Sequence, residues 1–196
     1  EEEVQFASEF KARHGLGNGA IIGLNTGAGK RWKQKNWTIE GYCGLIELII
    51  SDKRKEIGGI LLLGGPEEIE RNKYLAERYK DIVIDTGCDN TIREFGALVS
   101  LCDIVVTGDT LAMHIAIGLG KKVIALFGPT SYAEIELYGR GEKIYANNSN
   151  SSFQLENNKL GCLCCYKMDC AIHPNCMELI TPQQVLDAVQ RLWMGN

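Results

Sequence analysis

Residues 104–130, with the sequence IVVTGDTLAMHIAIGLGKKVIALFGPT, carry the clearest indication of how this chain folds. The apolar run Ile104–Thr107 has the length of a buried strand and leads into a tight turn at Gly108. A short apolar helix follows the turn, and a second buried strand is expected at Val123–Phe127. A strand-to-helix turn of this kind lies at the carboxyl edge of a parallel sheet, where α/β folds place their ligands.

The turn also has the composition of an anion site. Asp109 and Thr110 are good N-cap residues, because their side-chain oxygens accept backbone N–H groups that have no partner inside the helix. The N–H groups at residues 109–111, Leu111 included, lie at the positive end of the helix dipole. We therefore expect this helix start to bind a phosphate group.

The rest of the chain repeats the alternation of strand and helix. A helix over residues 38–53 places Tyr42, Leu45, Ile46, Ile49 and Ile50 on one face. Further helices are expected over residues 66–80, after the capping box Thr91-Ile-Arg-Glu94, and after Thr181-Pro-Gln-Gln184. The expected strands are Ala20–Leu24, Ile60–Leu63, Ile82–Ile84, Ile104–Thr107 and Val123–Phe127. This order predicts an α/β fold with a Rossmann-like, doubly wound parallel sheet.

Length and composition exclude some classes of protein. A chain of 196 residues is long enough for one domain with a sizeable core, and a net charge of -4 argues against a nucleic-acid-binding surface. No apolar run has the length of a membrane-spanning helix and no secretory signal is evident, so we expect a cytoplasmic protein. The sequence starts without Met at EEEVQFASEF, which is typical of a helix or linker inside a longer chain. We expect a linker or helix over residues 1–19 and one domain over residues 20–196.

Small residues follow the first expected strand in the segment Leu24–Trp32, LNTGAGKRW. They let the backbone approach a ligand closely, and Lys30 adds a compact positive charge. The spacing is not that of a Walker A loop. Taken alone, the segment fits either a ligand-binding loop or a flexible loop with a solvated lysine.

Eight cysteines are unevenly distributed, and Cys43, Cys88 and Cys102 stand in apolar contexts typical of buried free thiols. The others crowd into a loop over residues 162–176. Cys162, Cys165, Cys170 and Cys176 have the spacing C-x2-C-x4-C-x5-C, which fits a structural zinc site or an iron–sulfur cluster. Free thiols or disulfides are the alternative.

The motif at residues 109–130 resembles glycosyltransferase family 9, the lipopolysaccharide heptosyltransferases. That family has a pattern close to D-[ST]-x-x-x-H-x-A followed by a strand that ends in F-G-P-T, which Asp109, Thr110, His114, Ala116 and residues 127–130 match. Leu111 stands where many members have Gly. The family's G-A-x-x-K-x-W segment is similar to residues 27–32, although the usual Pro that follows is Lys33 here.

This resemblance covers residues 21–189 and implies the C-terminal domain of a GT-B glycosyltransferase, entered by residues 1–19 from an absent N-terminal domain. It implies that the domain binds a nucleotide-diphosphate sugar, ADP-heptose above all. The whole enzyme would transfer the sugar with inversion to a lipopolysaccharide inner-core acceptor, without a cofactor. The acceptor and the general base belong to the N-terminal half, so this chain alone is expected to bind nucleotide but to transfer little. The full-length enzyme is expected in the cytoplasm or at the inner face of the inner membrane.

The resemblance also implies roles for single residues. Thr26 and Lys30 match the family's Thr and Lys that contact the donor diphosphate, with Gly27 beside them in the loop. Lys30 and the helix N–H groups would stabilise the negative charge that grows on the departing diphosphate, which is electrostatic catalysis without a metal. Asp109 can cap the helix, touch the sugar, or do both.

Glu68 best fits the position of the family's ribose-binding acid, with Glu67 close behind. Alternatively, both acids only suit the first turn of a helix. Asn90, in the turn 87–91, is expected beside the base through main-chain contacts. His114 is expected to be structural or to contact the donor, although a lone His on an apolar helix is typical of a core residue.

Two other functions remain open on the sequence. One is a different GT-B enzyme acting on a nucleotide sugar, such as an epimerase or hydrolase. The other is a non-catalytic nucleotide-binding module in which the cysteine loop is a metal or thiol sensor.

Overall fold

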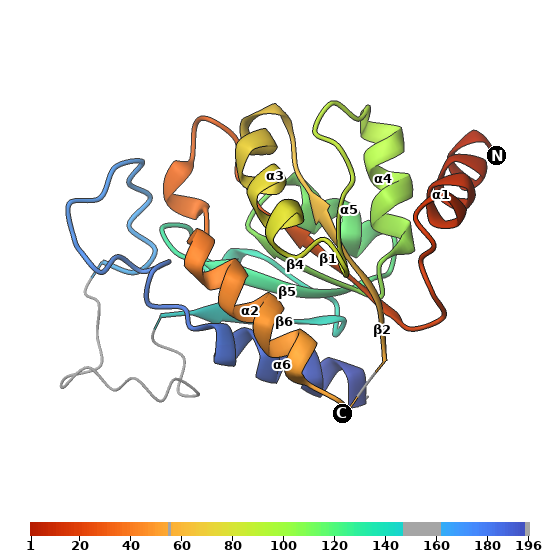
Figure 1. The fold of residues 1–196 in the computed structure, drawn as a ribbon. Coiled ribbons are helices and arrows are strands. Elements are labelled where there is room, and N and C mark those ends of the chain that lie inside the picture. The colour runs from red at the N-terminus through yellow and green to blue at the C-terminus, as the bar shows by residue number, and fades with distance from the viewer. Residues whose placement is uncertain (55, 147–161, 195–196) are drawn as a thin grey trace.

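A six-stranded sheet forms the centre of the molecule (Figure 1). The computed structural model describes residues 1–54, 56–146 and 162–194. The strand order is β3-β2-β1-β4-β5-β6 and every neighbouring pair is parallel. Because this order reverses between β1 and β4, the prediction of a doubly wound Rossmann-like sheet is confirmed. The strands are β1 (Ala20–Asn25), β2 (Ile57–Leu63), β3 (Val83–Asp85), β4 (Ile104–Gly108), β5 (Lys122–Phe127) and β6 (Gly141–Tyr145).

Helices cover both faces of the sheet, which is why its central strands are continuously apolar. The helices are α1 (Glu2–Arg13), α2 (Ile39–Ser51), α3 (Ile69–Arg78), α4 (Ile92–Leu101), α5 (Leu111–Gly118) and α6 (Pro182–Met194). One core cluster joins α2, α3 and α6 to the sheet, and a second joins α1, α4 and α5 to the opposite face. Figure 1 shows α2 beside α6 and α1 beside α4.

Local capping signals fix several helix starts where the sequence predicts them. Thr38 accepts a hydrogen bond from the Gly41 N–H at 2.9 Å, at the start of α2. Thr91 and Glu94 form the predicted capping box of α4. In the same way the Thr181 N–H donates to the Gln184 amide oxygen at 2.8 Å before α6.

Two expectations differ from the structure. Ile50 is 41% exposed, because it lies at the edge of the α2 face that the other predicted residues bury. Strand β6 is absent from the sequence prediction, because its sequence GEKIY is charged and half-buried, as suits an edge strand that pairs only with β5 among the described strands.

The expected linker or helix over residues 1–19 contains α1, which packs on α4 through Phe10. An ion pair of 2.6 Å between Arg93 Nη1 and Glu3 Oε1 joins the same two helices. The exposed loop predicted at residues 147–152 lies outside the described residues. Within the described ranges, no helix has the length and apolar character that crossing a membrane requires.

Candidate functional site

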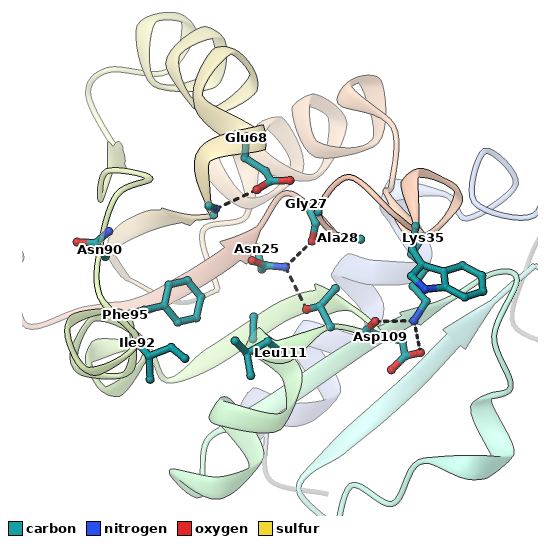
Figure 2. A pocket seen from close by; sticks show the side chains of 16 residues that line it. Asn25, Gly27, Ala28, Lys35, Glu68, Asn90, Ile92, Phe95, Asp109 and Leu111 are labelled. Atoms are coloured by element: carbon teal, nitrogen blue, oxygen red, sulfur yellow. Dashed lines mark hydrogen bonds and ion pairs between the residues drawn. The ribbon is translucent and has the colours of Figure 1, made fainter. Parts of the chain in front are cut away.

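A cavity of about 490 Å³ opens at the carboxyl ends of the central strands (Figure 2). Its walls come from the loops that follow β1, β2, β3 and β4, so residues far apart in sequence meet there. The cavity therefore occupies the crevice between β1 and β4, where the strand order reverses and doubly wound folds bind their ligands.

Asn25, the last residue of β1, ties the floor of this cavity together. Its side-chain amide donates to the Gly27 carbonyl at 2.8 Å and lies 3.2 Å from Thr107 Oγ1. The same amide nitrogen lies 3.3 Å from Thr110 Oγ1, and the Tyr42 hydroxyl donates to the Asn25 carbonyl at 2.8 Å. Asn25 therefore links the loop after β1 to the loop after β4. The sequence signal for Asn25, which the predictions above leave without a role, is a polar residue at the end of a buried strand.

The start of α5 differs from the expected capped helix. Thr110 is the N-cap residue, but no side chain of the described residues caps this helix there. The Asp109 carboxylate instead pairs with Lys35, whose Nζ lies 2.7 Å from Oδ2, so the expectation that Asp109 caps α5 is wrong. The Met113 N–H donates to the Thr110 carbonyl at 3.1 Å, whereas Leu111 and Ala112 line the cavity, so their N–H groups are the ones placed for a ligand.

Lys30 and Lys35 both lie between β1 and α2, but their side chains line different cavities. Lys30 is 80% exposed and its Nζ lies 3.1 Å from Glu67 Oε1. It lines a second cavity of about 430 Å³ rather than the first. Lys35, which the sequence analysis missed, lines the first cavity. No local sequence signal marks Lys35, because its partner Asp109 lies 74 residues away.

Thr26 is fully buried and does not line the first cavity. Its hydroxyl donates to Asn72 Oδ1 at 2.5 Å, and its carbonyl accepts from Arg71 Nη1. These contacts attach the β1 loop to α3. Gly27 does line the cavity, beside Glu68.

Glu68 lies between the two cavities and lines both. Its side chain is buried, and Oε2 accepts the Gly65 N–H at 2.9 Å. A Cβ on Gly27 would lie 1.8 Å from Glu68 Oε1, so only glycine lets the carboxylate rest on the loop. Glu67, in contrast, forms an ion pair with Lys30 and does not line the first cavity. The ribose-binding role stays a prediction, and the geometry favours Glu68 for it.

An apolar wall closes the other side of the first cavity. It consists of Ile92 and Phe95 from α4 and Leu111 from α5, which Figure 2 shows on one side of the pocket. Ile92 and Phe95 are three residues apart and share a helix face, a signal that the sequence analysis did not use. Asn90 adjoins this wall, and its amide donates to the Gly87 carbonyl at 2.9 Å, which closes the turn before α4. A flat, partly apolar group such as a nucleobase fits against such a wall.

His114 is exposed and lines neither of the two cavities. His114 belongs to α5, in which the neighbouring Met113 is buried but His114 is not. The structure therefore places His114 apart from the residues that surround the first cavity.

The cysteine loop packs on the segment after β5. The Tyr166 N–H donates to the Pro129 carbonyl at 2.8 Å, and the Cys176 thiol lies next to Gly128. Burial, and after it the neighbouring Cys162, Cys165 and Cys170, together raise the pKa of the Cys176 thiol to about 11.

Those cysteines are free thiols. In the part of the chain that the structure describes, no group of three or more His, Cys, Asp or Glu side chains is arranged to hold a metal ion. A zinc site at Cys162, Cys165, Cys170 and Cys176 therefore remains a prediction from the sequence.

Comparison with known proteins identifies relatives of the whole domain. The sequence model described as glycosyltransferase family 9 (heptosyltransferase) matches residues 2–163. Lipooligosaccharide heptosyltransferase 2 of Campylobacter jejuni subsp. jejuni is 26% identical over 200 residues, which cover 97% of this chain and 57% of that protein. The chain thus spans little more than half the length of this relative.

Solved structures agree on the fold. The E. coli ADP-heptose lps heptosyltransferase II superposes with a TM-score of 0.69 at 20% identity, covering 97% of this chain and 51% of that one. The E. coli heptosyltransferase WaaC with ADP superposes with a TM-score of 0.63 at 21% identity, covering 95% of this chain and 48% of that one.

Proposed function

Because the chain belongs to glycosyltransferase family 9, we propose that it is the donor-binding domain of a heptosyltransferase and that its donor is ADP-heptose. The observation that carries the proposal is the cavity of about 490 Å³ between β1 and β4, with an uncapped helix start at one end and an apolar wall at the other. Its volume lies in the usual range of small-molecule sites, about 300–1,000 Å³. The structures of E. coli relatives named for ADP-heptose and for ADP support the choice of nucleotide.

Each part of such a donor would lie against a different part of the cavity. The diphosphate would lie at the N-terminus of α5, against the N–H groups of Leu111 and Ala112. The buried Glu68 carboxylate would accept hydrogen bonds from the ribose hydroxyls. The adenine would pack on Phe95 and Ile92, near the backbone of the Asn90 turn.

Lys30 would complete the diphosphate site from the rim. Its exposed ion pair with Glu67 is of a kind that contributes little stability, so the donor can draw the ammonium away from the carboxylate. Negative charge grows on the diphosphate as the sugar leaves. Lys30 and the α5 N–H groups would stabilise that charge more in the transition state than in the ground state.

We further propose that the full-length enzyme transfers the heptose with inversion to a lipopolysaccharide inner-core acceptor. The acceptor and the general base would come from residues outside this chain, which spans about half of its relatives. This chain alone would then bind the donor without transferring the sugar at a useful rate.

Calorimetric titration of the chain with ADP, UDP and GDP tests the proposal. We expect ADP to bind most tightly, and Glu68→Gln and Lys30→Ala each to weaken ADP binding about tenfold, since the first removes the charge that strengthens the ribose hydrogen bonds and the second removes a charged donor. Lys53→Ala is the matched control, because Lys53 follows α2 at the opposite end of the sheet and lines neither described cavity. Equal affinities for the three nucleotides, or no binding of any, would refute the assignment.

A further inference from the structure

We propose that Lys35 is a positioning residue for the donor diphosphate, because it neutralises Asp109 and holds that carboxylate away from the start of α5. This inference rests on the proposed function of the first cavity. The interaction itself is an ion pair of 2.7 Å between Lys35 Nζ and Asp109 Oδ2, shown beside the cavity in Figure 2.

The pair is partly buried, and both of its side chains are less exposed than those of most ion pairs among the described residues. The side chains of Lys35 and Asp109 are 14% and 16% exposed, whereas that of Lys30 is 80% exposed. Lys35 Nζ also donates to the Asp109 carbonyl at 3.1 Å and lies 5.1 Å from the centre of the Trp32 ring. A carboxylate, a carbonyl and an aromatic face thus hold one ammonium group in place.

The backbone around Lys35 is fixed as well. Lys35 ends a short 3-10 helix, Lys33–Lys35, and a Cβ on Gly108 would lie 3.0 Å from the Lys35 carbonyl oxygen. The turn therefore packs directly on the end of β4. This close approach brings a cation from the segment after β1 to Asp109, two residues before α5 and 74 positions away in sequence.

Charge explains why the site needs this cation. A diphosphate brings negative charge to the start of α5, and Asp109 stands next to that start. An unpaired carboxylate there would repel the ligand, because a partly buried charge is screened less by solvent than an exposed one. With Lys35 in place the pair is neutral, and the α5 N–H groups can attract the diphosphate without opposition.

Lys35 is thus distinct in role from Lys30. Lys30 would touch the ligand, whereas Lys35 acts through Asp109. The pair predicts that ADP affinity follows its net charge, which is zero in the natural chain, negative in Lys35→Met and zero again in Lys35→Met combined with Asp109→Asn.

The test compares ADP with adenosine, which lacks phosphate, by titration of the natural chain and its variants. We expect Lys35→Met to weaken ADP binding about tenfold, because it leaves a partly buried carboxylate unpaired beside the diphosphate, and to change adenosine binding less than about twofold. Adding Asp109→Asn should restore ADP affinity to within about threefold of the natural chain. Lys33→Met is the matched control, because Lys33 belongs to the same turn but is exposed and lies outside the first cavity.

Each outcome decides the matter. If Lys35→Met weakens ADP and adenosine equally, or if Asp109→Asn fails to restore ADP binding, then Lys35 only supports the fold and the inference is wrong. If the natural chain binds ADP and Lys35→Met binds it equally well, the inference fails while the proposed function stands. If the natural chain binds no ADP, both fail.

Discussion

Replacing Tyr42 by Phe isolates one buried hydrogen bond beneath the cavity. The Tyr42 side chain is 1% exposed, and its hydroxyl donates to the Asn25 carbonyl at 2.8 Å. The ring also contacts Trp37 edge to face, with centroids 5.1 Å apart, and Phe keeps that contact. The substitution therefore removes only the hydroxyl and leaves the Asn25 carbonyl without this donor.

The expected loss follows from that geometry. Leaving a buried acceptor unpaired costs about 1–3 kcal/mol, so we expect Tyr42→Phe to lower the free energy of unfolding by about 2 kcal/mol. That loss corresponds to about a 30-fold change in the ratio of folded to unfolded protein. For a domain of this size the midpoint temperature should fall by about 4–8 °C.

Urea unfolding followed by circular dichroism measures the change. Tyr74→Phe is the matched control, because Tyr74 is 47% exposed and its hydroxyl lies 3.4 Å from Arg78 Nη1 at the surface. The control should change the free energy of unfolding by less than about 0.5 kcal/mol. If Tyr42→Phe is no more destabilising than Tyr74→Phe, the reasoning about the cavity floor is refuted.

Further predictions concern the loop glycine and the thiols. Gly27→Ala should weaken ADP binding at least about tenfold by displacing Glu68. Gly96→Ala should leave ADP binding unchanged, because its new Cβ meets nothing within 4 Å. Equal effects of the two substitutions would contradict the account of this loop. Burial raises the pKa of Cys102 to about 12, so at pH 8 it should stay a thiol and react with an aromatic disulfide only after unfolding, and rapid labelling of the native protein would overturn this. Cys170 should react with the same aromatic disulfide in the native chain. If its loop holds a zinc site, added zinc should protect Cys170 from this reaction. Labelling of Cys170 that zinc leaves unchanged would contradict such a site.

Local signals in the sequence were sufficient for most of the fold. The strands β1 to β5 are apolar because both faces of the sheet are covered, and the caps at Thr38, Thr91 and Thr181 act within a few residues of themselves. Strand β6 was missed, since an edge strand buries too little to need an apolar run. The family motif at residues 109–130 then indicated which end of the sheet carries the site.

The arrangement of the site was less predictable, because it depends on contacts between distant residues. Asp109 is a residue type that often caps helices, yet the partly buried Lys35 ammonium binds its carboxylate instead. Thr26 lies in the predicted loop, yet its hydroxyl faces Asn72 in α3 rather than the cavity. In both cases a partner from another element determines where the side chain points, and spacing along the chain contains no record of that partner.

The floor of the cavity, which Asn25 links together, and the apolar wall differ in how well they should tolerate substitutions. The floor is a set of mutually dependent polar contacts, so single substitutions there disturb two loops at once. The wall opposite consists of separate side chains. Ile92 and Leu111 are 68% and 58% exposed, so replacing them should disturb the core little. Nucleotide preference could therefore diverge among descendants of this domain, or be redesigned, through the wall alone while the scaffold beneath stays intact.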